Sequence, residues 1–318
     1  MKNIVRISII FVILSLLYSC KFRSEIDLDR IELADQLASR ETKMLYHRIQ
    51  EIAKSGIAFG HQDATAYGIG WEHADDPSRL RSDIQEVAGK LPAVHGYDVG
   101  HIEIGSPHNL DTVSFALMKD HIQQIHKLGG IGTISWHINN PVTNGGSWDT
   151  TPAVSEVLKG GAEREKFELW IKRLSDFLKS LKDVDNNAIP IAFRPWHEMN
   201  GGWFWWGSGS TTPEEYKQLW RETKELLERN NVHNLLYVYS PNTLNSPDEF
   251  DTYYPGDEFV DILGVDIYNH SGNEAFTKSL KGNLAILKEK SAIKGKPYVL
   301  SETGNNNFGE DEFWWTET

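Results

Sequence analysis

The stretch IPIAFRPWHE, residues 189–198, is a short apolar run that ends in charged and aromatic side chains. Similar apolar runs recur along the chain, at residues 56–60, 93–97, 131–135, 235–239, 262–265 and 298–300. Runs that are apolar on both faces are typical of parallel strands covered by helices. The sequence therefore predicts a sheet of seven parallel strands.

Amphipathic segments separate these runs. Residues 111–128 and 167–181 carry apolar side chains at helical spacing, and residues 212–215, Thr-Pro-Glu-Glu, form a capping box with proline at the first helical position. Strands that alternate with helices predict an α/β fold, here a (β/α)₈ TIM barrel. A doubly wound sheet needs a glycine-rich turn after its first strand, and residues 60–63, Gly-His-Gln-Asp, lack that pattern.

The composition excludes several classes of protein. The net charge is −13, from 32 basic and 45 acidic residues. Because no basic block stands out, nucleic acid is not an expected partner. An acidic surface also disfavours a polyanionic substrate, so a neutral one is preferred. We expect a monomer.

The first twenty residues read as an export signal. Lys2 and Arg6 precede the apolar run 9–17, which is too short to span a bilayer. Cys20, the single cysteine of the chain, ends a segment that resembles a bacterial lipobox. We therefore expect a signal peptide at 1–20, a helical lead-in at 21–55 and a catalytic barrel at 56–318. Lipidated Cys20 would anchor the protein in the cell envelope, facing the periplasm or the outer surface.

Two glutamates lie just behind apolar runs, where the catalytic groups of a barrel sit. Glu198 follows the fourth run, and Glu302 follows the seventh. Glycoside hydrolysis needs two such carboxylates, one to protonate the leaving oxygen and one to attack or to direct water. The alternative for each glutamate is a solvated loop residue or a partner in a structural ion pair.

The segment RPWHEMNGGWFWWG, residues 194–207, is very similar to the acid/base segment of glycoside hydrolase family 26. Shorter segments resemble this family in the same order along the chain, at residues 59–62, 97–98, 135–137, 140–141, 239–242, 264–269 and 301–304. The resemblance covers roughly residue 56 to the C-terminus. It implies a retaining mechanism, with Glu198 as general acid and then base and Glu302 as nucleophile.

The resemblance also implies roles for residues around this pair. Tyr268 would donate a hydrogen bond to Glu302, and Arg194 would add a positive charge nearby. His137, His197 and Trp203 match positions that line the sugar subsites; for His137 the alternative is a hydrogen-bonded packing residue. From the residues themselves, Trp148 is a second candidate platform for a sugar ring, and Asp98 is a candidate hydroxyl binder.

The histidines do not show an established metal-ligand spacing. His121 and His126 lie five positions apart on a predicted helix, which does not suit one ligand face. We therefore predict no metal and no cofactor.

The sequence departs from the family in one respect. The family closes its barrel with an eighth strand, and this sequence stops before one. An open barrel leaves two unpaired strand edges, which is costly. We therefore predict that residues 21–318 alone are poorly stable and weakly active or inactive.

The expected function is an endo-acting β-1,4-mannanase that hydrolyses β-mannan or manno-oligosaccharides. A β-1,3-xylanase or a mixed-linkage β-glucanase on the same scaffold is the alternative within the enzymes. A non-hydrolytic carbohydrate-binding lipoprotein is the alternative outside them.

Overall fold

The computed structural model describes residues 27–72, 80–306 and 313–314. The chain divides into two compact units, residues 1–32 and 33–318, and the described part of the first contains the 3₁₀ helix η1, Leu28–Arg30. The predicted signal segment and Cys20 lie outside the described residues. Within the described ranges, no helix has the length and apolar character needed to cross a membrane.

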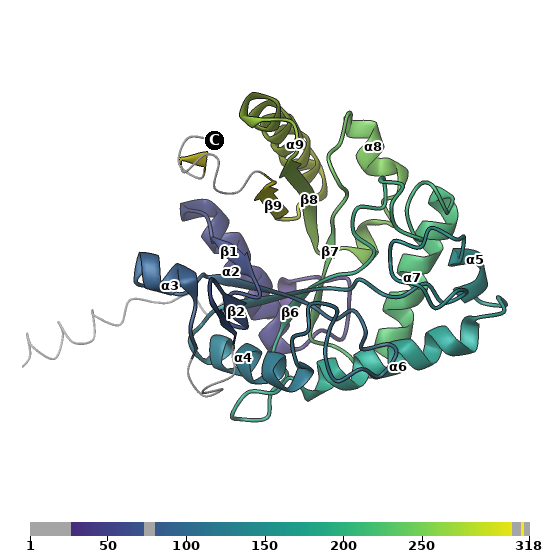
Figure 1. The fold of residues 1–318 in the computed structure, drawn as a ribbon, viewed down its shortest axis with the longest axis horizontal. Helices are drawn as coiled ribbons and strands as arrows, with labels where there is room; N and C mark the ends of the chain where they lie inside the picture. Colours follow the sequence, from purple (N-terminus) through teal and green to yellow (C-terminus); the bar gives the residue numbers. More distant parts are fainter. Residues whose placement is uncertain (1–26, 73–79, 307–312, 315–318) are drawn as a thin grey trace, which may run out of the picture. The chain divides into compact units, whose positions relative to one another are not determined.

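Seven strands of the second unit form one parallel sheet, in the order β1-β4-β5-β6-β7-β8-β9 (Figure 1). They are β1 Gly60–Gln62, β4 Val94–Asp98, β5 Ile131–Ser135, β6 Ile191–Arg194, β7 Leu235–Tyr239, β8 Ile262–Asn269 and β9 Tyr298–Asn305. A separate hairpin pairs β2, Tyr67–Gly68, with β3, Trp71–Glu72. The prediction of a (β/α)₈ barrel without its last strand is confirmed for the described residues. The prediction about stability remains a prediction.

Helices follow the strands along the chain. They are α2 Arg40–Ser55, α3 Asp83–Ala88, α4 Phe115–Lys127, α5 Val154–Val157, α6 Arg164–Ser180, α7 Pro213–Arg229, α8 Pro247–Thr252, the 3₁₀ helix η2 Asp257–Phe259 and α9 Asn273–Lys294. The predicted capping box is present at the start of α7, where Thr212 and Glu215 bond reciprocally. Most of the predicted apolar stripe of α6 is buried, and Phe177 is partly buried.

Two helices begin later than their apolar pattern indicates. Residues 109–113 form a turn instead of the first turn of α4, because Asn109 Oδ1 accepts bonds from the backbone N–H groups of Asp111 and Val113. In the expected lead-in, α2 begins only at Arg40, where the Ser39 hydroxyl caps it by accepting from Thr42 N.

Strands β8 and β9 extend past their predicted ends into polar residues. Backbone pairing continues from Asp266–Glu302 to Asn269–Asn305, and the ladder forms whether the side chains are apolar or polar. The register shifts between Val265 and Asp266, so that Ser301 is an extra residue in β9. Such a β-bulge re-aims the side chains that follow it. Glu302, the next residue, therefore owes its direction to the bulge.

The core beneath the site is rich in tryptophan. Trp136, Trp196, Trp205 and Trp206 are fully buried, and Trp196 contacts each of the other three. Trp205 is therefore a packing residue. This rigid layer supports the loop that carries Glu198.

Candidate active site

Glu198 stands on a tight turn just after β6. Trp196 and Glu198 have φ angles of 53° and 54°, a left-handed conformation that non-glycine residues rarely adopt. Neighbouring elements hold the turn: Glu198 N donates to Ser240 O at 2.8 Å, and the Tyr216 hydroxyl donates to Trp196 O at 2.9 Å. The tertiary structure therefore enforces the backbone that presents Glu198.

Both oxygens of Glu198 accept hydrogen bonds. Trp203 Nε1 donates to Oε2 at 2.8 Å, and Asn242 Nδ2 donates to Oε1 at 2.9 Å. Asn200 in turn accepts from Asn242 N at 2.8 Å, which fixes the loop after β7. These contacts orient the carboxylate.

Glu302 accepts bonds from Arg194 and from Tyr268. The Tyr268 hydroxyl donates to Glu302 Oε2 at 2.8 Å, and Arg194 Nη2 donates to Oε1. Burial, with a further contribution from Asp266, raises the pKa of Tyr268 to about 12, so its hydroxyl stays protonated and able to donate. A positive charge and a donor on one carboxylate favour its ionised form.

Arg194 also binds a second acid, which sequence reasoning missed. Its Nη1 donates to Asp266 Oδ2 at 2.7 Å, and both side chains are buried. Ser240 donates to the other oxygen of Asp266 at 2.7 Å. Burial raises the pKa of Asp266 to about 6, against the opposing effect of Arg194. Asp266 therefore holds the Arg194 guanidinium in place through this bond.

The carboxylates of Glu198, Asp266 and Glu302 converge: one oxygen of each lies within 4.8 Å of one oxygen of each of the others. Three acids so close could hold a metal ion. Here the Arg194 guanidinium already supplies a cation to two of them. The prediction of no metal remains a prediction.

Asp98, His137 and His197 form a hydrogen-bonded chain. Asp98 Oδ2 lies 2.7 Å from His137 Nδ1, and His137 Nε2 lies 3.1 Å from His197 Nε2. Asp98 and His197 are buried, and both ring nitrogens of His137 face protein groups. That Asp98 binds a sugar hydroxyl directly is not supported by this geometry, because its oxygens are already occupied. Sugar contacts by either histidine remain predictions.

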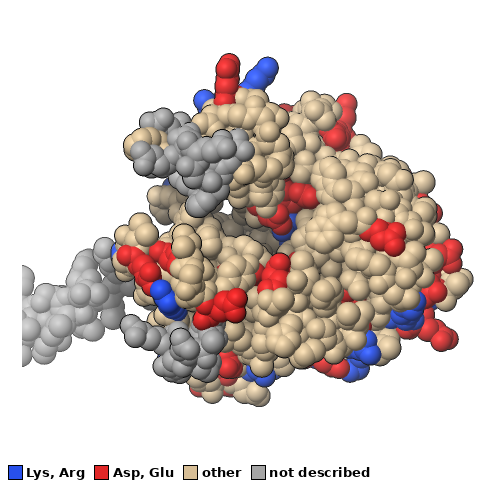
Figure 2. Space-filling view, in the orientation of Figure 1, with Lys and Arg blue, Asp and Glu red and all other residues tan. Residues whose placement is uncertain are grey.

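Two tryptophans present exposed faces among these groups. Trp148 is 57% exposed and Trp203 is 39% exposed. That these faces bind sugar rings remains a prediction. Figure 2 shows a hollow on one face of the molecule, with acidic and basic side-chain atoms next to each other in its wall. Trp148 lies on His137, with ring centroids 5.2 Å apart and planes inclined by 15°.

All nine residues predicted for the site lie at the carboxyl ends of the strands or in the loops that follow. Hydrogen bonds or ring contacts join each of them to another member. Asn242 and Asp266 were missed, although both follow predicted strands and lie in segments 239–242 and 264–269, which resemble the family. Their position was the signal that could have identified them.

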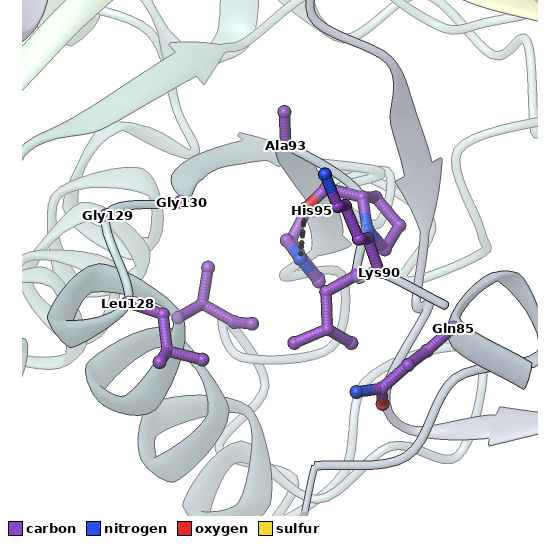
Figure 3. A pocket seen from close by; sticks show the side chains of 10 residues that line it. Gln85, Lys90, Ala93, His95, Leu128, Gly129 and Gly130 are labelled. Carbon is purple, nitrogen blue, oxygen red and sulfur yellow. Dashed lines mark hydrogen bonds between the residues drawn. The ribbon is translucent and has the colours of Figure 1, made fainter. Parts of the chain in front are cut away.

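A cavity of about 340 Å³ lies at the other end of the sheet (Figure 3). It is lined by the segment that leads into β4 and by the C-terminal end of α4, with His95 bonded to Pro92 O at 3.0 Å. None of the predicted site residues lines it. We therefore assign the chemistry to the carboxylate cluster.

Comparison with known proteins identifies the class to which this fold and site belong. Residues 34–304 match the model of glycosyl hydrolase family 26, and the chain belongs to that family. A mannan endo-1,4-β-mannosidase of Bifidobacterium adolescentis is 33% identical over 87% of this chain and 28% of its own length. A mannan endo-1,4-β-mannosidase of Bacillus subtilis is 29% identical over 85% of this chain and 71% of its own.

A solved structure gives the same assignment. The structure of a GH26 β-mannanase from Bacteroides ovatus is 42% identical to this chain, with a TM-score of 0.84. The match covers 88% of this chain and 80% of that one. The chain thus spans most of the solved mannanase but about a quarter of the Bifidobacterium relative.

Proposed function

We propose that this protein is a retaining endo-β-1,4-mannanase that hydrolyses β-mannan or manno-oligosaccharides by double displacement. The observation that carries the proposal is the approach of Glu198 and Glu302, whose oxygens come within 4.8 Å. Retaining glycosidases hold their two carboxyl groups about 5–5.5 Å apart, whereas inverting enzymes separate them by about 6.5–9.5 Å to admit a water. The short separation leaves room for direct attack.

The surroundings of the two glutamates support different roles. Glu302, bonded by Arg194 and Tyr268, is held as an anion and is suited to attack the anomeric carbon. Glu198 then gives a proton to the leaving oxygen and later removes one from water. Three neighbouring carboxylates with one guanidinium favour keeping one proton within the cluster, because like charges oppose full ionisation.

Mannan is proposed as the substrate because the named relatives act on it. The exposed faces of Trp148 and Trp203 suit a neutral pyranose, whose C–H face packs on an indole ring. A negatively charged polysaccharide would meet the acidic cluster unfavourably.

Reducing-sugar release from mannan, β-1,3-xylan and lichenan by the wild type and by Glu302→Ala tests the proposal. We expect release from mannan by the wild type alone, with the β-anomer as the first product seen by proton NMR. Release only from xylan or lichenan would favour the alternative enzymes. Binding without release would favour a carbohydrate-capture protein, and an α-anomer as first product would exclude retention.

We further propose that the protein is a monomer tethered to the bacterial cell envelope by lipidated Cys20. Support comes from Lys2, Arg6 and the apolar run 9–17 ahead of that cysteine. Expression of Cys20→Ala in the native host should move the protein from the membrane fraction to the soluble fraction. Light scattering on the detached protein should give a mass close to one chain.

A further inference from the structure

Asp98 is a buried acceptor that no direct substrate contact explains. Its side chain is 3% exposed. Oδ1 accepts from Gly100 N at 2.7 Å, and Oδ2 accepts from Ser135 Oγ at 2.7 Å and faces His137 Nδ1 at the same distance. A buried carboxylate with this many donors is fixed in position.

An ionised carboxylate can only accept, so it determines where the proton of His137 sits. Burial opposes the charge on Asp98, but the charge and hydrogen bonds of His137, with the donors Ser135 and Gly100, outweigh it and lower the pKa of Asp98 to about 2. The Nδ1 proton of His137 therefore points at Asp98, and Nε2 is left to face His197. Both ends of the imidazole are held.

The fixed imidazole carries the exposed indole of Trp148. The two rings are nearly parallel, and Phe204 braces both, with its centroid 5.4 Å from His137 and 5.6 Å from Trp148. Trp148 sits in a loop after β5 and has more than half of its surface free. Its orientation therefore depends on what lies behind it, which is the ring of His137.

We propose that Asp98 is a positioning residue that fixes His137 and, through it, sets the orientation of Trp148 as a platform for one pyranose ring of the substrate. The substrate class rests on the proposed function above; the coupling from Asp98 to Trp148 does not. Asp98 itself touches no sugar. Its effect is on binding of the ring rather than on the bond-breaking step.

The first test needs no substrate. Nitrogen-15 NMR of histidine-labelled wild type should show His137 protonated at Nδ1, and contacts between His137 and Trp148 protons should be present. Asp98→Asn offers an amide that can donate to Nδ1, so the Nδ1 proton should be lost and the contacts to Trp148 should weaken. The proposal is overturned if Nδ1 of His137 is unprotonated in the wild type, or if the contacts between His137 and Trp148 are unchanged in Asp98→Asn. The wild-type measurement stands even if Asp98→Asn fails to fold.

The second test is a double-mutant cycle with mannohexaose. Asp98→Asn should raise KM about tenfold and change kcat less than threefold, and the same should hold for Trp148→Ala. The double variant should be no worse than Trp148→Ala, because the effect of Asp98 passes through that ring. Additive losses, or a fall in kcat alone, contradict the coupling.

Ser135→Ala provides the matched control. It removes a donor to the same Asp98 oxygen but leaves the contact with His137, so KM should stay within twofold of the wild type. A rise in KM equal to that of Asp98→Asn would contradict the proposal, because it would show that any disturbance around Asp98, and not the loss of the His137 contact, weakens binding. If the wild type neither binds nor cleaves mannohexaose, the proposed function fails, while the NMR result still decides the coupling.

Discussion

Trp203 and Glu198, five positions apart, are joined by a 2.8 Å hydrogen bond from the indole Nε1 to the carboxylate Oε2. The same indole is 39% exposed. One side chain thus has an exposed face, proposed to bind a sugar ring, and an N–H bonded to the proposed acid/base. The two proposed roles of Trp203 can be separated by mutation.

Trp203→Phe separates these two roles, because phenylalanine keeps an aromatic face and loses the donor. The bond orients the carboxylate that is proposed as acid/base. Its loss should therefore lower kcat on mannan about tenfold, since a bond to a charged group contributes roughly 1.5 kcal/mol. Trp148→Phe, which has no bond to Glu198, should leave kcat within about twofold of the wild type. An unchanged kcat in Trp203→Phe would show that the bond is absent in solution.

Replacement of the two glutamates should give opposite products with azide. Glu198→Ala should lose about 10²–10⁴-fold on mannan and recover on an aryl mannobioside, whose leaving group needs no proton. With azide it should give the β-mannosyl azide, formed from the covalent intermediate. Glu302→Ala should give the α-azide by direct attack. Identical azide anomers from both variants would contradict the assigned roles.

Arg194→Lys tests the bridge between Glu302 and Asp266. A lysine cannot reproduce two directed bonds, so one buried carboxylate loses its partner. We expect kcat to fall at least about tenfold and the free energy of unfolding to fall by about 3 kcal/mol, measured by urea denaturation. Arg221→Lys, where the arginine donates only to Pro255 O among the described contacts, is the matched control, with a loss below about 1 kcal/mol. An unchanged kcat and an unchanged free energy of unfolding in Arg194→Lys would contradict the proposed importance of the bridge.

Asp63 should make stability depend on pH. Burial, and then Asp111, raises its pKa to about 7 in the folded chain from 3.8. Below about pH 4 Asp63 is protonated in both the folded and the unfolded chain, so it does not change the free energy of unfolding. Between pH 4 and pH 7 the unfolded chain ionises first, so the free energy of unfolding falls as pH rises, and the loss is complete above about pH 7. Asp63→Asn should be more stable than wild type at pH 8 by up to about 4 kcal/mol, and the difference in the free energy of unfolding should be smaller at pH 5.

Urea unfolding at both pH values measures this difference. Asp185→Asn, in an exposed turn, is the control and should show no such change between pH 5 and pH 8. A wild type as stable as Asp63→Asn at pH 8 would contradict the prediction.

The sequence by itself determined the approximate positions of six of the seven strands, the cap of α7 and the two glutamates. The first apolar run was predicted as a strand at 56–60, and β1 instead lies at Gly60–Gln62. Apolar runs and capping residues act over a few positions, so their signal is local and can be read from the chain. Parallel strands gather their carboxyl ends at one edge, and for this reason polar residues behind the runs could be assigned to one site from the sequence alone.

The tertiary structure alone decided which partner each of these side chains meets. Asp98 was expected to bind a sugar hydroxyl and is instead buried behind His137, because Ser135 and His137, 37 and 39 positions away, bond one of its oxygens. The bulge at Ser301, the bridging role of Asp266 and the donor Asn242 depend on backbone register and contacts between strands distant in sequence. Such contacts exist only once the sheet has formed, and no local pattern encodes them.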